Sequence, residues 1–394
     1  MIRSRSSILS RSRLFIFIGS LAWGMPAFAQ ELAEGLQAHG FISQSVVYTS
    51  DNNVGGKSDD ALSMDLREMG VNLSWRPNPD WLLSGQVLSR WAGETDNGGL
   101  RLDYGFIDRS LFSDGNSQMG IRLGKIKNPY GFHNTTRDVA HTRPGIIMPQ
   151  SIYLDQIRNF FLAAPGASLY GNFDNDEMNV SWQISALRPE VNDSNLERFF
   201  LLGDFPGHYE GSGSWLSQIL FDLGGRWRAG LSLGEMNMKF RPTTASHQLP
   251  TWVLSIENNT DAWSFTGEYG QTTVKGRNYF PPIVEHTTEA WYLQTTRHME
   301  WGWQAYLRYD VLYFDKNDRD GTSFVANNPG FPYPTSSRFA KDWVLGLRRD
   351  LDRLELSAEW HRVDGTAWLD HVQNTPATLV RKWDMLLLQA AWRF

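Results

Sequence analysis

Apolar and polar residues alternate along many stretches of the chain. At the C-terminal end, residues 384–394, one face carries Leu386, Leu388, Ala390, Trp392 and Phe394. The same period of two recurs in residues 100–107, 178–187, 303–311 and 354–361. Alternation of this kind indicates β-strands, and runs of about nine residues fit a strand that crosses a membrane at a tilt. The pattern therefore predicts an all-β protein.

The connections between these stretches fall into two classes that alternate along the chain. Short, turn-like breaks are found at residues 76–80, 113–117, 174–176, 224–225, 258–261, 298–300 and 350–352. Longer polar stretches lie between them, at residues 49–63, 92–99, 125–165, 188–213, 241–250, 275–285, 315–341 and 364–381. Transmembrane barrels have short turns at the periplasmic rim and long loops at the other. We therefore predict a transmembrane antiparallel β-barrel of about 16 strands over residues 30–394.

The first 29 residues have the features of a secretory signal peptide. Arg3, Arg5, Arg11 and Arg13 precede a short apolar stretch, and an Ala-Phe-Ala sequence ends at Ala29. The apolar stretch is too short for a membrane-spanning helix, which needs about 20 residues. Because four arginines leave with this segment, the net charge of −6 becomes −10. A nucleic-acid-binding protein usually has a basic excess, so nucleic acid is not an expected partner.

Composition agrees with a barrel but does not select it. The mean hydropathy is −0.40, a value that a soluble protein or a polar-lined barrel can both give. Many of the 17 tryptophans lie at or near proposed strand ends, as in the aromatic girdles of membrane barrels. The alternative is an exported, Trp-rich soluble β-sandwich that binds carbohydrate. The chain has no cysteine, which excludes disulfides and thiolate metal sites.

Three short segments resemble the sixteen-stranded porins of Gram-negative bacteria. Residues 391–394, Ala-Trp-Arg-Phe, are similar to the C-terminal signal read by the barrel-assembly machinery, with Trp392 and Phe394 as its aromatic residues. Residues 120–132, GIRLGKIKNPYGF, look like the entry to the constricting third loop of non-enteric porins, and residues 306–310, YLRYD, resemble a strand motif in their C-terminal half. The acidic Pro-Glu-Phe-Gly-Gly segment of enteric porins is missing from the third loop. The likeness is therefore closer to phosphate-selective and other substrate-leaning porins.

This resemblance implies a location and a set of partners. We expect an outer-membrane protein, exported through the periplasm, that contacts outer-membrane lipid and lipopolysaccharide. The family assembles as homotrimers and lets small hydrophilic solutes diffuse passively. These properties are expectations for this chain.

The long connection at residues 125–165 is the candidate constriction, because a long loop without structure of its own is usually functional. Folded into the lumen, it would set the pore width. Its cationic or titratable residues are Lys125, Lys127, His133, Arg137, Arg143 and Arg158; the proposed inner wall adds Arg90, Arg101, Asp103, Arg109 and Arg122. Arg and Lys in a narrow pore favour anions. The alternative is that these cations pair with nearby carboxylates or lipopolysaccharide phosphates.

An outer-membrane barrel hydrolase is the third candidate. The nine histidines are scattered, and neither a metal-binding His spacing nor a Gly-x-Ser-x-Gly motif occurs. His361 lies two residues after Glu359 and is the nearest approach to an acid–base pair, but such pairs in a lumen are more often solvated. We therefore do not expect catalysis, a cofactor or a bound metal.

Overall fold

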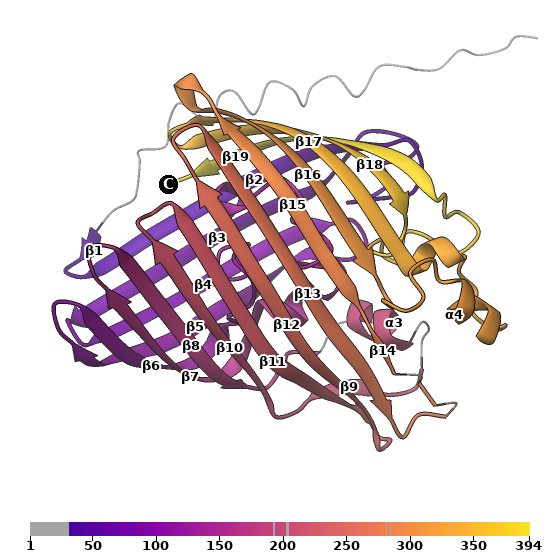
Figure 1. Ribbon diagram of the computed structural model, residues 1–394, viewed down its shortest axis with the longest axis horizontal. Coiled ribbons are helices and arrows are strands. Elements are labelled where there is room, and N and C mark those ends of the chain that lie inside the picture. Colours follow the sequence, from indigo (N-terminus) through magenta and orange to yellow (C-terminus); the bar gives the residue numbers. More distant parts are fainter. Residues whose placement is uncertain (1–30, 192–193, 202–204, 281, 284) are drawn as a thin grey trace, which may run out of the picture.

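The chain folds as one closed antiparallel β-barrel with a loop folded inside it (Figure 1). The computed structural model describes residues 31–191, 194–201, 205–280, 282–283 and 285–394. The predicted signal peptide, residues 1–29, lies outside the described residues. Sixteen of the strands form the wall, and β19 pairs with β2 to close it. This confirms the predicted architecture.

The wall strands are long, as tilted membrane strands should be. In chain order they are β2 (Leu36–Thr49), β3 (Ser63–Asn78), β4 (Trp81–Ala92), β5 (Asn97–Ser113), β6 (Ser117–Lys127), β7 (Ala163–Asp174), β8 (Met178–Leu187), β10 (Ser214–Leu223), β11 (Trp227–Arg241), β12 (Ala245–Asn259), β13 (Trp263–Arg277), β15 (Glu289–His298), β16 (Trp303–Tyr313), β17 (Phe339–Leu351), β18 (Leu354–Gly365) and β19 (Lys382–Arg393). Three short strands add to the rims: β1 (Glu31–Ala33), β9 (His208–Gly211) and β14 (His286–Thr287).

The helical segments all lie in connections. The third loop contains η1 (Ala140–Thr142), η2 (Asp155–Ile157) and α2 (Arg158–Leu162), and the loop between β8 and β10 contains α3 (Ser194–Leu201). The turn before β16 contains η3 (Glu300–Gly302), and the loop before β17 contains α4 (Thr322–Asn327) and η4 (Thr335–Arg338). Among the described residues, no helix has the length and apolar character to cross a membrane.

The predicted alternation of short and long connections is present, with two exceptions. All seven short turns join the expected strand pairs. The predicted long loops at residues 92–99 and 241–250 were wrong, because β5 already begins at Asn97 and β12 at Ala245. Those two connections are residues 93–96 and 242–244. Polar residues mark the segment 245–250 as a loop in the sequence, but alternate residues there are buried inside the barrel.

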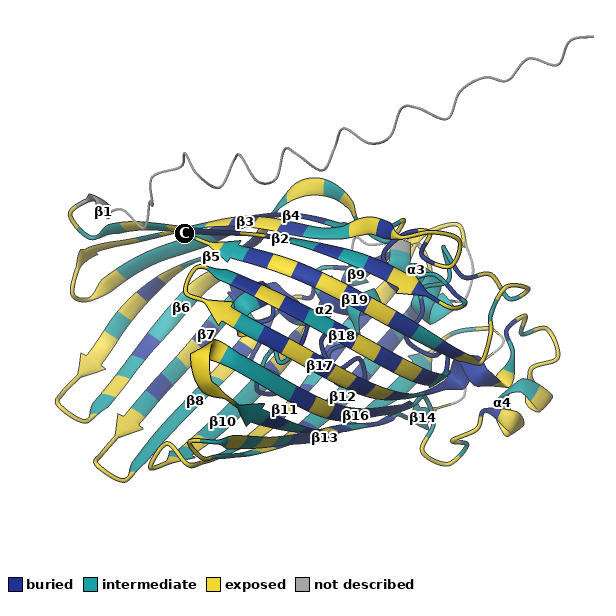
Figure 2. Ribbon diagram, turned by 90° about the horizontal axis from the view of Figure 1, so that it is seen from above, coloured by how far each residue is buried: buried dark blue, intermediate teal, exposed yellow. Residues whose placement is uncertain are grey.

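Each wall strand exposes one face and buries the other. On β19, Leu386 and Leu388 are about half exposed, whereas Met385 and Leu387 are buried. The two faces are visible as alternating bands of colour on β17, β18 and β19 (Figure 2). A large exposed apolar surface is unfavourable in water, but it is the expected lipid-facing band of a membrane barrel.

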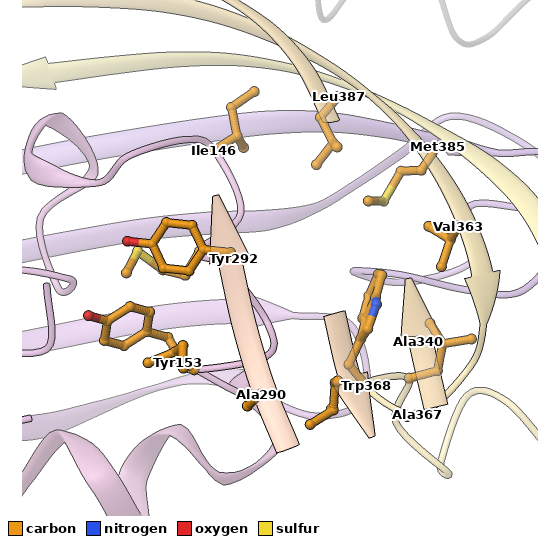
Figure 3. Close-up of a cluster of buried hydrophobic side chains, with 14 of the residues drawn as sticks. Ile146, Tyr153, Ala290, Tyr292, Ala340, Val363, Ala367, Trp368, Met385 and Leu387 are labelled. Atoms are coloured by element: carbon orange, nitrogen blue, oxygen red, sulfur yellow. The ribbon is translucent and has the colours of Figure 1, made fainter. Parts of the chain in front are cut away.

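The third loop is folded into the lumen and packs against the C-terminal half of the wall. It runs from residue 128 to 162, because β6 continues to Lys127 and β7 starts at Ala163. Ile146 and Tyr153 of this loop share a buried apolar cluster with Tyr292 of β15 and Leu387 of β19 (Figure 3). Trp368, from the loop between β18 and β19, completes the cluster from the long-loop rim.

Candidate functional site

Three wall carboxylates hold the third loop from the far side of the barrel by accepting hydrogen bonds from its backbone. Glu268 of β13 accepts from the N–H of Phe132 at 2.8 Å. Asp310 of β16 accepts from the N–H of Ser151 at 3.3 Å. Glu359 of β18 accepts from two consecutive amides, those of residues 146 and 147, at 2.9 and 3.2 Å. Since a buried N–H without a partner is costly, these carboxylates fix the path of the loop across the lumen.

Two arginines of the same wall hold the loop through its carbonyl groups. Arg308 of β16 donates to the carbonyl of Ile147 at 3.0 Å, and Arg348 of β17 donates to the carbonyl of Arg143 at 2.9 Å. Both guanidinium groups are buried. The far wall therefore binds the loop backbone through carboxylates, which accept from its N–H groups, and through arginines, which donate to its carbonyl groups.

His361 belongs to this holding structure. Its Nδ1 lies 2.7 Å from Asp342 and its Nε2 lies 3.2 Å from Glu359, the carboxylate that binds the loop amides. The side chain is fully buried. The expectation that this pair would be solvated was wrong, because the folded loop removes this part of the wall from water.

On the near side, loop cations form ion pairs with the N-terminal wall. Arg143 contacts Glu68 of β3 at 2.5 Å, and Arg158 contacts Asp103 of β5 at 3.5 Å. Arg90 of β4 pairs with Glu68 at 3.0 Å and with Asp155 of the loop. Buried ion pairs of this kind need partners on every side to offset desolvation. The structure thus brings together Arg90, Asp103, Arg143 and Arg158, four of the residues that the sequence singled out.

Further pairs lie within the loop and beside it. Lys127 binds Asp138 at 2.7 Å and lies over the ring of Tyr104, and Arg137 contacts Asp155 at 3.4 Å. Arg101 joins the group through Asp96, at 2.7 Å. The result is one charge cluster whose cations are Arg90, Arg101, Lys127, Arg137, Arg143 and Arg158 and whose carboxylates are Glu68, Asp96, Asp103, Asp138 and Asp155. We call it the near-wall cluster.

Arg122 faces the lumen but lies outside this cluster. It pairs with Asp108 at 2.7 Å and its guanidinium stacks on the rings of Phe106 and Tyr170. It therefore lies on the inner face of the wall with its own carboxylate beside it.

Two of the predicted pore residues lie outside the near-wall cluster. Arg109 is exposed and stacks on Trp81, on the strand face opposite to the inward-facing Asp108, because successive residues of a strand point to opposite faces. Lys125 pairs at 2.5 Å with Glu190 of the loop between β8 and β10, away from the near-wall cluster. A bulge in β5 at Asp103 shifts the alternation there, which residue counting along the sequence does not reveal.

His133 lies inside the loop instead of lining the passage. Its ring packs against Phe132 and Tyr153, and its Nε2 has no hydrogen-bond partner among the described residues. Burial, followed by the nearby Arg228 and Arg308, lowers the pKa of His133 to about 3. The ring is therefore neutral and serves packing.

A cavity lies between the loop, the near wall and the long-loop rim. It has a volume of about 90 Å³ and is partly open to solvent. Its charged lining is Glu68, Arg90, Arg137, Arg143, Asp155 and Arg158 of the near-wall cluster, together with Arg67 of β3 and Asp370 of the β18–β19 loop. Its apolar lining includes Ile146 and Met148 of the loop and Trp368 and Leu369 of the β18–β19 loop. This cavity is the candidate functional site.

Sequence reasoning missed the wall groups that hold the loop: Glu68, Glu268, Arg308, Asp310, Arg348 and Glu359. A partial signal was available, because Arg308 and Asp310 occur in the strand motif at residues 306–310. Charged residues two apart lie on one strand face, so the motif indicated an inward charged pair. Its contact with a loop more than 150 residues away could not be read from the sequence.

The predicted assembly residues lie at the seam where the barrel closes. The rings of Trp392 and Phe394 are 4.9 Å apart, next to the pairing of β19 with β2. They contact the wall from outside the lumen and take no part in the cavity.

Comparison with known proteins gives a fold. No protein-family model matches the sequence, and no curated protein matches it. Among solved structures, the anion-selective porin from Comamonas acidovorans is similar with a TM-score of 0.58 and 12% identity, covering 91% of this chain and 99% of the porin. The outer membrane channel DcaP of Acinetobacter baumannii is similar with a TM-score of 0.59 and 13% identity, covering 94% and 100%. The trimer form of OmpT, an outer membrane protein of Vibrio cholerae, has a TM-score of 0.57 and 10% identity over 91% and 99%.

The chain therefore has the fold of the bacterial outer-membrane porins, with a closed barrel of sixteen strands. Together with the lipid-facing apolar band, this fold indicates an integral membrane protein.

Proposed function

We propose that the protein is a porin that lets small hydrophilic solutes diffuse passively across the outer membrane and favours anions. The observation that carries this proposal is the near-wall cluster, which lines the cavity between the third loop and the barrel wall. Among the described residues it contains six cations and five carboxylates, although the chain as a whole is acidic. A positive excess in a low-dielectric passage favours anions.

The position of the other carboxylates supports the same preference. Glu268, Asp310 and Glu359 are buried and bind loop amides on the far wall. They do not line the cavity, whose charged lining has five arginines against the carboxylates Glu68, Asp155 and Asp370. We therefore infer that the charges of the near-wall cluster set the electrostatic field along the passage.

We further propose that the chain forms a homotrimer through the outer face of its N-terminal strands. A hollow on that face is lined by apolar side chains and glycines from β3 to β6, including Leu73, Trp75, Leu102, Ile107 and Leu123. A second copy fits this surface, since a trimer form is known for a protein of the same fold. Leu102→Cys should form cross-links between subunits, whereas Leu254→Cys, equally exposed on β12, should not.

Single-channel recording in a planar bilayer tests the proposed function. The refolded protein should conduct, and its reversal potential in a potassium chloride gradient should indicate chloride preference. A protein that inserts without conducting would contradict the porin function. A conducting channel with potassium preference would contradict the anion preference alone.

A further inference from the structure

The cavity lining has two chemically different parts. Arg90, Arg137, Arg143 and Arg158 belong to the near-wall cluster, whereas the apolar lining residues Ile146, Met148, Trp368 and Leu369 belong to one buried apolar cluster. Ligand sites are typically apolar pockets with a few convergent polar groups that fix orientation. An opening that served only for water and inorganic ions would not require the apolar part.

Asp155 is the only carboxylate of the loop that lines the described cavity, and it lies among these arginines. It contacts Arg90 and Arg137, and its side chain is 38% exposed while those arginine side chains are nearly buried. Burial alone would raise the pKa of Asp155, but Arg90, Arg137, Arg158 and Arg143 lower it to about 2. Asp155 is therefore an ionised carboxylate, attached to the loop, that lies among arginines and is accessible from the cavity. We call it the tethered anion.

Arg158 retains binding capacity. Its side chain is 4% exposed, and its ion pair with Asp103 is long, at 3.5 Å. Its Nη2 has no hydrogen-bond partner among the described residues. A buried guanidinium N–H without an acceptor is costly, and an anion in the cavity would supply that acceptor.

We propose that this cavity binds a small organic carboxylate with an apolar body, whose carboxylate takes the place of Asp155 among the arginines. Arginine recognises carboxylates through two parallel hydrogen bonds, and the apolar body would lie on Ile146, Met148 and Trp368. This inference rests on the proposed function and names the solute class of the same passage.

The arrangement makes Asp155 a specificity-determining residue. A carboxylate entering the cavity exchanges with an attached carboxylate of the same charge, so the cluster keeps its balance and the solute stays weakly bound. Weak binding suits passage, because a solute must also leave. Without the tethered anion, the solute carboxylate meets an uncompensated positive charge and binds more tightly.

The experiment measures equilibrium binding of benzoate to the refolded full-length protein by tryptophan fluorescence, and current block by benzoate in single channels. Benzamide has the same apolar body without charge, acetate has the charge without the body, and inorganic phosphate tests a simple anion site. Benzoate should bind at least tenfold more tightly than the other three. A Trp368→Phe variant should lose the fluorescence change and keep the block.

Two variants test the residues named. Asp155→Asn should tighten benzoate binding about tenfold, and Arg158→Gln should weaken it about tenfold, whereas Asp320→Asn on the exposed β16–β17 loop should change nothing. Heat-modifiable migration verifies folding; if Asp155→Asn fails to fold, Asp155→Glu, which keeps a tethered carboxylate, should bind as the wild type does.

The outcomes separate this inference from the proposed function. Equal binding of benzoate and benzamide, stronger binding of phosphate, or no effect of Arg158→Gln would overturn the inference while leaving a conducting porin. Absence of conductance would contradict the porin function, and the fluorescence titration would still decide whether the cavity binds the carboxylate.

Discussion

Gly40 of β2 and Phe394, the last residue of the chain, form a reciprocal backbone pair that closes the barrel. The N–H of Gly40 donates to the carbonyl of Phe394 at 2.8 Å, and the N–H of Phe394 donates to the carbonyl of Gly40 at 2.9 Å. The Phe394 ring also covers Gly40: a Cβ added there would lie 2.2 Å from the ring. Glycine at residue 40 is therefore required by the aromatic ring at the end of the chain.

This pairing predicts that deletion of Phe394 and the substitution Gly40→Val impair assembly. Either change weakens the last contact of the seam, and unpaired backbone groups at an open edge in hydrocarbon cost several kcal/mol each. The amount of heat-modifiable, membrane-embedded protein should fall several-fold. Gly115→Ala is the control, because a Cβ there meets no atom within 4 Å. Normal levels of embedded protein for Gly40→Val would show that the ring does not need this space.

The wall was predictable from the sequence and the inside of the barrel was only partly so. Period-two alternation and turn spacing depend on neighbouring residues, so strands such as β16 and β19 are evident from local sequence. The contact of Glu359 with the amide of Ile146 joins residues 213 apart, and nothing in the local pattern encodes it. Charged residues of the loop could be named as a group, but their partners Glu68 and Asp103 follow from the way the loop folds across the lumen.

The two rims predict different accessibility in intact cells. Asn317 lies in the long β16–β17 loop and Asp261 in the short β12–β13 turn, and both are exposed. A cysteine at Asn317 or at Asn327 of α4 should react with a membrane-impermeant maleimide from outside. A cysteine at Asp261 should react only after the outer membrane is opened. Labelling of both in intact cells would mean that the rims are assigned wrongly.

Loss of a far-wall carboxylate should loosen the third loop. Glu359→Leu removes the acceptor of two loop amides, and each unsatisfied buried N–H costs about 1–3 kcal/mol. We expect larger and noisier single-channel currents, because the loop then leaves the wall part of the time. Glu257→Leu is the matched control, since this half-buried carboxylate of β12 bonds Asn259 and Thr266 and lies away from the loop. Unchanged conductance and noise for Glu359→Leu would contradict a holding role.

Loop docking should weaken as pH falls below neutrality, because of two histidines. Burial lowers the pKa of His133 to about 3 and lowers that of His141 below its usual value. Below about pH 6.5 the undocked loop binds protons that the docked loop does not. The equilibrium constant for docking therefore falls by roughly tenfold per pH unit for one histidine as the pH decreases from there toward 3. Asp155, with a pKa of about 2, adds a loss only below its ordinary value of 3.8.

Hydrogen exchange of the loop amides at pH 7 and pH 4.5 measures this effect after correction for the intrinsic rates. Protection should fall at pH 4.5 in the wild type, and His133→Gln combined with His141→Gln should remove most of the pH dependence. His208→Gln, in an exposed strand at the rim, should not. Equal pH dependence in all three proteins would exclude the loop histidines as its source.

The charges of the near-wall cluster should set ion selectivity, and the sign of each change is predictable. Replacing Lys127, Arg137 and Arg143 with Gln removes three cations of the near-wall cluster, whose field extends over about the Debye length, roughly 10 Å at 0.1 M salt. Their partners Glu68, Asp138 and Asp155 stay, so the reversal potential should move toward cation preference, strongly at 0.1 M and weakly at 1 M. The control pair Lys316→Gln and Arg319→Gln on the outer loop should do much less.

A variant of opposite sign separates electrostatics from structural damage. Glu68→Gln with Asp138→Asn removes two carboxylates of the same ion pairs, with nearly the same side-chain volumes, and should move the reversal potential toward anion preference. General disruption of the loop would instead move both variants in the same direction, toward the weak selectivity of a wide pore. If neither variant changes the reversal potential at low salt while both conduct, the passing ions do not follow the near wall, and the path of conduction must lie elsewhere in the lumen.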